Sequence, residues 1–342
     1  MTGVSVIIKA LNEEAKIAKA IESALRAIEG VGGEVILADA LSDDRTVQIA
    51  RRYPITIVQL VRAADRGCGS GPQLGFQHAR GKFIYLLDGD MELDAGFIEA
   101  ALPHLRSEDD VAGVGGVIEY PGVLSIEYRK RHLKQQTQKP GYVSHLGCGG
   151  LYRTDAIRQV GYLSNRNLHS FEELELGLRL RSAGWKLKRI DRTSVRHHTH
   201  QLGAYSFLAR RWRDGFALGA GELLRSAIGK SYLPSVLREF RGLLMVAGWI
   251  PMLVLVLILS VPVTLPLRLA VLTALLAAPV SVLSVKRRSV QVGLYTVVAH
   301  CFVLVAAIRG ALRSQVDPTR PIDNQVLQRG EWSQPHAQKK LA

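Results

Sequence analysis

The chain has 342 residues, 47% of them hydrophobic, so it is long enough for a complete α/β domain and an additional apolar segment. Its formal net charge is +14. The three cysteines, Cys68, Cys148 and Cys301, are too widely spaced for a zinc site or a disulfide framework, which favours a reducing compartment. The first residues lack a basic region and a long apolar run, so we expect a first strand there and no signal peptide.

Short apolar runs and helical patterns alternate over the first sixty residues. Strands are predicted at 4–8, 34–38 and 55–60. Asn12 is expected to cap a helix after the first strand, and a second helix is expected to open at Ser42. This β-α-β-α-β order is typical of a parallel sheet covered by helices.

A glycine-rich loop and an acidic strand end follow. The loop at 65–72 enters a helix, and its backbone amides could cradle a phosphate, although its spacing is that of neither a dinucleotide fingerprint nor a P-loop. A buried strand at 82–87 then ends in Asp88-Gly89-Asp90. Open α/β sheets bind ligands at such strand ends, and two carboxylates can hold Mg²⁺ or Mn²⁺. The same triplet is also the composition of an ordinary turn.

The next segment continues the alternation. Residues 91–94 are expected to lead into a helix over 95–105, and a strand is predicted at 111–118. An exposed basic helix is predicted within 120–141. Gly149 and Gly150 would then allow a close approach of the backbone to a ligand or another segment.

Acidic residues and histidines concentrate further along. A helix begins after His169 with Glu172 and Glu173 in its first turn, a position that the helix dipole alone would also favour. A strand at 186–190 precedes three closely spaced histidines, which are uncommon outside metal or acid–base chemistry: His197, His198 and His200.

The positive charge lies next to the most apolar part of the chain. Residues 179–241 contain 14 Lys and Arg against 4 Asp and Glu. Residues 242–285 contain a single charge, Arg268, which gives room for two membrane helices at about 243–262 and 267–285. This adjacency favours anionic lipid headgroups over nucleic acid, for which the chain has no recognisable module. A hairpin places its basic flanks on the cytoplasmic side.

A third apolar run, 290–308, is long enough to span a membrane or to lie in its interface. The residues after it are rich in proline, glutamine and charge, so the tail is expected to be disordered.

Taken together, the motifs resemble the inverting glycosyltransferases of family 2, which have a GT-A fold: a Rossmann-like, mixed and mostly parallel sheet with helices on both faces. The resemblance covers about residues 4–212. Its motifs are the Val-Ser-Val-Ile-Ile strand with Asn12-Glu13-Glu14, Asp39 followed by Ser42, Asp44 and Thr46, Gly67–Gly75, Gly81–Asp90, Gly149–Arg153 and Glu172–Trp185.

The resemblance implies a nucleotide-diphosphate sugar donor and a divalent cation, Mn²⁺ or Mg²⁺, held by Asp90, Asp88 and His197. It implies Glu173 as the catalytic base, where the family usually has Asp. The remaining residues that it places near the nucleotide sugar are Ala10, Asn12, Glu13, Asp39, Ser42, Gly67, Asp88, Gly149, Gly150, Glu172, Arg211 and Trp212. Leu208–Trp212 lacks the Gln of processive synthases, which favours single sugar additions.

We accordingly expect a GT-A domain over 1–212, basic juxtamembrane helices over 213–241, a membrane segment over 242–310 and a disordered tail over 311–342. The expected function is sugar transfer at the cytoplasmic face of the inner membrane, to a lipid-linked or other glycan acceptor in cell-surface glycan or polysaccharide biosynthesis. Two alternatives remain open: a polyprenyl-phosphate sugar synthase, and a non-catalytic membrane scaffold of a glycan-assembly complex.

Overall fold

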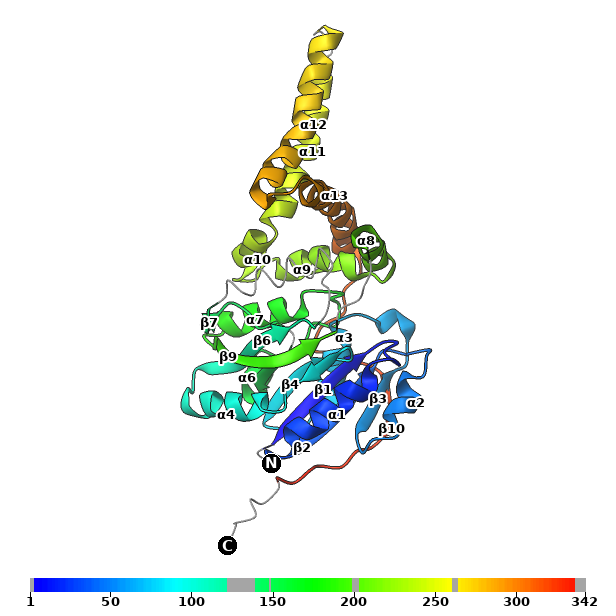
Figure 1. Cartoon of the computed structure of the whole chain (residues 1–342), viewed down its shortest axis with the longest axis vertical. Helices are drawn as coiled ribbons and strands as arrows, with labels where there is room; N and C mark the ends of the chain where they lie inside the picture. The colour runs from blue at the N-terminus through cyan, green and yellow to red at the C-terminus, as the bar shows by residue number, and fades with distance from the viewer. Residues whose placement is uncertain (1–2, 122–138, 148, 199–202, 260–263, 336–342) are drawn as a thin grey trace. The chain divides into compact units, whose positions relative to one another are not determined.

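The computed structural model describes residues 3–121, 139–147, 149–198, 203–259 and 264–335 (Figure 1). The chain forms two compact units, which are described separately. The first contains residues 1–201 and 314–342, and the second contains residues 202–313. The first stretch of the first unit ends at residue 201, before the expected domain end at residue 212, and the helix α8 (Ala204–Arg213) belongs to the second unit.

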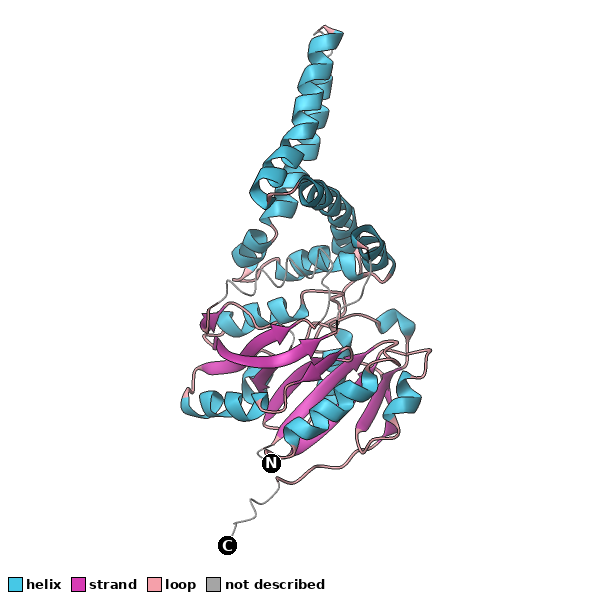
Figure 2. Cartoon of the chain, in the orientation of Figure 1, coloured by secondary structure: helices cyan, strands magenta, loops and turns pink. Residues whose placement is uncertain are grey.

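The first unit is built on a mixed sheet, which has ten strands among the described residues (Figure 2). The order is β10-β3-β2-β1-β4-β8-β6-β9-β5, with β7 paired to β9. The central strands β3, β2, β1 and β4 are parallel, as the β-α-β pattern predicted. The strands are β1 Val4–Ala10, β2 Gly33–Asp39, β3 Thr56–Leu60, β4 Phe83–Asp88, β5 Met91–Leu93, β6 Val111–Glu119, β7 Gly141–Val143, β8 Gly150–Arg153, β9 Lys186–His197 and β10 Asn324–Gln328.

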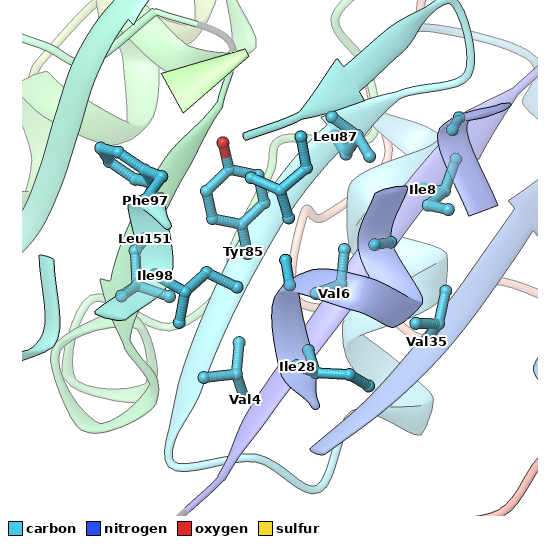
Figure 3. Close-up of a cluster of buried hydrophobic side chains, with 14 of the residues drawn as sticks. Val4, Val6, Ile8, Ile28, Val35, Tyr85, Leu87, Phe97, Ile98 and Leu151 are labelled. Carbon is cyan, nitrogen blue, oxygen red and sulfur yellow. The ribbon is translucent and has the colours of Figure 1, made fainter. Parts of the chain in front are cut away.

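Helices cover both faces of this sheet. The first hydrophobic core packs α1 (Ile17–Ile28), α2 (Thr46–Ala50) and α4 (Phe97–Ser107) on one face. Figure 3 shows part of it, where side chains of the central strands meet α1 and α4. The second core packs the other face against three helices: α3 (Ser70–His78), α6 (Thr154–Gln159) and α7 (Glu172–Ser182). The expected α/β class is confirmed.

Strand register brings the candidate residues to one edge of the sheet. On β1, Val6 and Ile8 point into the first core and Ile7 points into the second, so the next residue on the Ile7 face is Lys9. Lys9 is the register partner of Asp88 on β4, and Ala10 is the partner of Asp39 on β2. The carboxyl ends of three parallel strands therefore deliver charged side chains to the same edge.

Two local expectations are wrong. Asn12 does not cap a helix, because α1 begins at Ile17 and Asn12 has a left-handed backbone with φ of 57°. Its Oδ1 instead accepts a hydrogen bond of 2.9 Å from the backbone N–H of Asp43. Residues 91–93 form the strand β5, which pairs antiparallel with β9. The basic helix expected within 120–141 falls mainly on 122–138, outside the described residues.

The expectation of a disordered tail is also wrong for residues 314–335. β10 pairs antiparallel with β3 at the edge of the sheet, and Ile322 is buried. Gln77 and Ile322 exchange two hydrogen bonds, of 2.7 and 3.1 Å. The Arg80 guanidinium lies 5.5 Å from the centre of the Trp332 ring. A polar composition does not prevent such pairing, because an edge strand is held mainly through its backbone groups.

The second unit is helical among its described residues. It begins with α8, a short turn of 3₁₀ helix at Phe216–Leu218, α9 (Gly219–Ala227) and α10 (Leu233–Glu239). Three longer helices follow, and each is long and apolar enough to cross a membrane by length and composition: α11 Arg241–Leu259, α12 Leu265–Arg287 and α13 Val290–Leu312. The chain is therefore membrane-associated through its C-terminal apolar helices.

Within this unit, α13 packs tightly on α9 and on the 3₁₀ turn before it. A Cβ placed on Gly221 would lie 1.7 Å from the carbonyl oxygen of Ala307, and one on Gly310 would lie 2.2 Å from that of Leu218. Both glycines are needed because only a residue without a side chain allows the two backbones to come this close.

Candidate functional site

The acidic triplet at the end of β4 packs directly on the loop that follows β1. The backbone N–H of Gly89 donates a hydrogen bond of 2.9 Å to the carbonyl oxygen of Lys9. A Cβ on Gly89 would lie 3.1 Å from Ala10 Cβ and 3.2 Å from Glu13 Cγ. The glycine therefore permits this close approach, and it brings the predicted residues Ala10 and Glu13 beside the two acids.

Lys9 lies at the centre of a cluster of three carboxylates. Its Nζ is 2.5 Å from Glu172 Oε1, 3.2 Å from Asp88 Oδ1 and 3.9 Å from Glu173 Oε1. Burial opposes the charge of Lys9, but attraction to Asp88, Glu172 and Glu173 prevails and raises its pKa well above the usual range. For Asp88, burial outweighs the attraction of Lys9 and raises the pKa of the carboxyl.

The two candidate bases on α7 differ in environment. The Glu172 side chain is 6% exposed and engages Lys9, whereas the Glu173 side chain is 22% exposed. Burial, together with repulsion from Glu172, raises the pKa of Glu173 to about 7. A carboxylate that titrates near neutral pH and reaches solvent is suited to accept a proton, so the geometry favours Glu173 over Glu172 as a base.

Asp90 and His197 form a second polar pair in the site. His197 Nε2 lies 3.2 Å from Asp90 Oδ2, and Lys16 Nζ lies 3.9 Å from the same oxygen. The next histidine contacts a different acid, with His198 Nε2 only 2.6 Å from Glu92 Oε1. Among the three predicted histidines, His197 is the one that the structure places on Asp90, while His200 lies outside the described residues.

The predicted metal set of Asp88, Asp90 and His197 is not assembled as a trio. The described residues contain no group of three or more His, Cys, Asp or Glu side chains arranged to hold a metal ion. Asp88 is engaged by Lys9, which leaves Asp90 and His197 adjacent to each other. A carboxylate oxygen and an imidazole nitrogen are suitable ligands for Mn²⁺, and a diphosphate can supply further oxygens. The donor set therefore fits a cation shared between protein and substrate.

Asp39 organises a separate network of polar side chains at the end of β2. Its Oδ1 accepts a hydrogen bond of 2.5 Å from Ser42 Oγ, and its Oδ2 accepts one of 2.7 Å from Gln59 Nε2. The Asn12 N–H in turn donates to Ser42 Oγ over 2.9 Å. The predicted trio Asp39, Ser42 and Asn12 is thus a connected network, and its contact with a nucleoside base stays a prediction.

The predicted glycines lie at close contacts between segments. A Cβ on Gly67 would lie 3.1 Å from the Leu168 carbonyl oxygen. Gly149 has φ of +80°, and its Cβ would lie 2.8 Å from Val195 Cγ1. A Cβ on Gly150 would lie 2.9 Å from the Tyr152 ring. These positions explain the glycines by packing, so their contribution to nucleotide-sugar binding stays a prediction.

Arg211 and Trp212 belong to α8 and therefore to the second unit. The Arg211 guanidinium lies 4.3 Å from the centre of the Phe216 ring. Trp212 packs on Phe302 with ring centres 4.6 Å apart, and the Arg309 guanidinium lies 5.1 Å from the Trp212 ring. Their predicted contact with the nucleotide sugar remains untested.

Lys9 and Lys16 were not predicted as site residues. Lys9 ends an apolar strand, and a lysine there is usually the point where the strand reaches solvent. The alternation of side chains along β1 could have identified Lys9, because it places Lys9 on the same face of the strand as the buried Ile7.

Comparison with known proteins relates the first unit to a family. Residues 5–161 match the model described as Glycosyl transferase family 2. Over these residues the chain is similar to the glycosyltransferases of that family. It is 26% identical over 113 residues to the dolichol-phosphate mannosyltransferase of Pyrococcus furiosus, covering 32% of each chain. It is 30% identical over 136 residues to the succinoglycan biosynthesis protein ExoO of Rhizobium meliloti, covering 40% of this chain and 38% of that protein. The matches thus span only about a third of these relatives.

Among solved structures, the mannosyltransferase PcManGT from Pyrobaculum calidifontis, in complex with GDP-Man and Mn²⁺, superposes with a TM-score of 0.63. It covers 91% of this chain and 88% of its own at 15% sequence identity. At that identity the similarity shows the fold alone. The expected GT-A-like fold is confirmed.

Proposed function

We propose that this protein is an inverting glycosyltransferase that moves a hexosyl group from a nucleotide-diphosphate sugar to a hydroxyl of a membrane-proximal, lipid-linked acceptor, one sugar at a time. The observation that carries the proposal is the convergence of the strand-end acid Asp88 and the candidate base Glu173 on one ammonium, that of Lys9. Donor-side and acceptor-side groups lie together at the edge of the sheet where α/β folds bind ligands.

The reaction is a single displacement. Glu173 accepts the proton of the acceptor hydroxyl, whose oxygen bonds to the anomeric carbon as the bond from that carbon to the diphosphate breaks. The nucleoside diphosphate leaves with the bonding electron pair. With a pKa of about 7, Glu173 is divided between its ionised and protonated forms near neutral pH, and the ionised form accepts the proton.

A divalent cation, Mn²⁺ or Mg²⁺, held by Asp90 and His197 would neutralise charge on the departing diphosphate. The complex of the similar PcManGT with Mn²⁺ supports this choice of metal. Asp39 with Ser42 and Asn12 is proposed to receive the nucleoside, and the glycine-rich loop before α3 is proposed to approach the donor.

The acceptor and the location are inferred from the second unit. Three apolar helices and the excess of Lys and Arg over residues 179–241 support a membrane-bound acceptor in cell-surface glycan biosynthesis. The positive-inside rule supports the cytoplasmic face of the inner membrane. The similarity to a succinoglycan biosynthesis protein supports the class of product.

A second candidate is a polyprenyl-phosphate sugar synthase, which the similarity to a dolichol-phosphate mannosyltransferase favours. The two differ in the nucleophile, because a phosphate oxygen is already ionised at neutral pH and needs no base. Purified full-length chain is incubated with Mn²⁺, a panel of nucleotide sugars and either bare polyprenyl phosphate or a lipid-linked sugar. Transfer to the lipid-linked sugar that is lost in Glu173→Gln supports the main proposal. Transfer to bare polyprenyl phosphate that survives in Glu173→Gln supports the second.

The non-catalytic scaffold is tested separately. If Asp90→Ala and Glu173→Gln both complement deletion of the gene as well as the wild-type chain does, the enzymatic proposal fails.

A further inference from the structure

Lys9 is a half-buried cation that has no role in the reaction proposed above. Its side chain is 18% exposed and lies beneath the start of α3, where a Cβ on Gly71 would be 2.8 Å from Lys9 Cβ. Ile7, two residues earlier on the same face, is completely buried in the second core. A lysine at this depth is costly unless acids compensate it.

Lys9 has more negatively charged neighbours than a structural ion pair requires. Glu172 alone, at 2.5 Å and 6% exposed, would suffice to neutralise Lys9. Yet Asp88 and Glu173 also lie within 4 Å of its Nζ, so one positive charge faces three carboxylates. Without the ammonium, these acids would repel one another across a partly buried space.

The three acids come from two parts of the chain with different proposed duties. Asp88 is the last residue of β4, on the donor side, whereas Glu172 and Glu173 begin α7, on the acceptor side. Lys9 lies on β1, beside Asp88 in register and 163 residues from Glu172. Its ammonium therefore contacts both the end of β4 and the first turn of α7.

We propose that Lys9 is a positioning residue for sugar transfer: its ammonium holds Asp88 and the Glu172–Glu173 turn together, which fixes the Glu173 carboxylate relative to the donor. By engaging Asp88, Lys9 also divides the acids of the site into two groups. Asp90 with His197 is left for the cation. This inference rests on the proposed function.

Substitution of Lys9 separates positioning from simple stabilisation. Lys9→Met keeps the length of the side chain and removes the charge, and Lys9→Arg keeps the charge. Because misplacing a catalytic group by about 1 Å can cost on the order of 100-fold, we expect Lys9→Met to lower kcat by roughly 10- to 100-fold. The donor KM should change by less than about 3-fold, since donor binding does not depend on the contact between Lys9 and the α7 acids. Lys9→Arg should recover part of kcat.

The chain offers a matched control. Lys186 Nζ lies 2.5 Å from Asp110 Oδ2, the same separation as in the Lys9–Glu172 pair, but both side chains are about half exposed. Lys186→Met should leave kcat unchanged, because exposed pairs contribute little. The double variant Lys9→Met/Glu172→Gln removes one positive and one negative charge. It should recover thermal stability lost in Lys9→Met without recovering kcat.

Wild-type kcat in Lys9→Met would overturn the inference. So would a double variant whose kcat equals that of Glu172→Gln alone, because Lys9 would then act only by neutralising Glu172. A stability cycle combining Lys9→Met with Glu173→Gln needs no substrate, and additive changes in melting temperature would show that Lys9 does not hold Glu173. If the wild-type chain transfers no sugar, the proposed function fails. The stability cycle still shows whether Lys9 and Glu173 interact in the folded protein.

Discussion

Lys9 and Asp88 are register partners on the neighbouring parallel strands β1 and β4, and Lys9 Nζ lies 3.2 Å from Asp88 Oδ1. The first acid of the Asp88-Gly89-Asp90 triplet is thus neutralised from within the protein. The second acid, Asp90, contacts His197 instead. Two carboxylates that are equivalent in the sequence therefore have different partners, which is the basis of the predictions below.

The pH dependence of transfer should report Glu173. Burial and Glu172 raise the pKa of its carboxyl to about 7, and the ionised form is the one that accepts a proton. Activity, measured as kcat/KM, should therefore rise with pH and level off above an apparent pKa of about 7. Glu173→Gln should lose roughly 100- to 10,000-fold in kcat while still binding the nucleotide sugar. If Glu173→Gln keeps both the wild-type rate and the rise of kcat/KM with pH, another group is the base.

Glu173 should also make the folded protein less stable as pH rises. The unfolded carboxyl ionises near its ordinary pKa of 4.5, whereas the folded one ionises only near 7. As pH rises above 4.5, ionisation of Glu173 favours the unfolded state and lowers the free energy of unfolding. This loss of stability is complete once the pH exceeds the folded pKa of about 7. Glu173→Gln removes the penalty, so it should raise the free energy of unfolding by roughly 1–3 kcal/mol at about pH 8 and by little at about pH 5. Thermal melts at the two pH values check this, and equal effects at both would contradict it.

The cation should depend on Asp90 and His197 more than on Asp88. His197→Ala and Asp90→Asn each remove one of two adjacent ligands, so the Mn²⁺ concentration for half-maximal activity should rise by roughly 10- to 100-fold. Asp88→Asn should alter kcat more than metal affinity. His198→Ala is the matched control, because the His198 side chain contacts Glu92, and its hydrogen bond to Asp90 runs between backbone groups that the substitution keeps. An equal loss of Mn²⁺ affinity in His198→Ala would overturn the assignment.

The C-terminal segment should stabilise the first unit. Truncation before Ile322 removes β10 and a completely buried isoleucine, which should cost roughly 2–4 kcal/mol and expose the β3 edge. Hydrogen exchange of the β3 amides should accelerate. Truncation after residue 335 removes only residues outside the described part and should leave β3 protected. If the chain truncated before Ile322 shows unchanged exchange of the β3 amides, β10 does not pair with β3 in solution.

Much of the first unit is predictable from the sequence. The β-α-β pattern, the strand before Asp88 and the helix that carries Glu173 all follow from local periodicity. Lys9 was missed because its partners on α7 lie 163 residues away, and only tertiary packing brings them together. The strand β5 was missed because its three residues follow the acidic triplet and pair only with β9. β10 was missed because a polar edge strand has no apolar run to mark it.

In the proposed mechanism, the Lys9 cluster joins the sugar donor to the base Glu173. This is tested by the kcat of the purified full-length chain with Mn²⁺, a nucleotide sugar and a lipid-linked acceptor, compared among wild type, Glu173→Gln and Lys9→Met. We predict transfer with inverted anomeric configuration by the wild type, loss in Glu173→Gln, and a reduced kcat with a nearly unchanged donor KM in Lys9→Met. Equal turnover by all three proteins would rule out both assigned roles, and a product of retained configuration would rule out a single displacement.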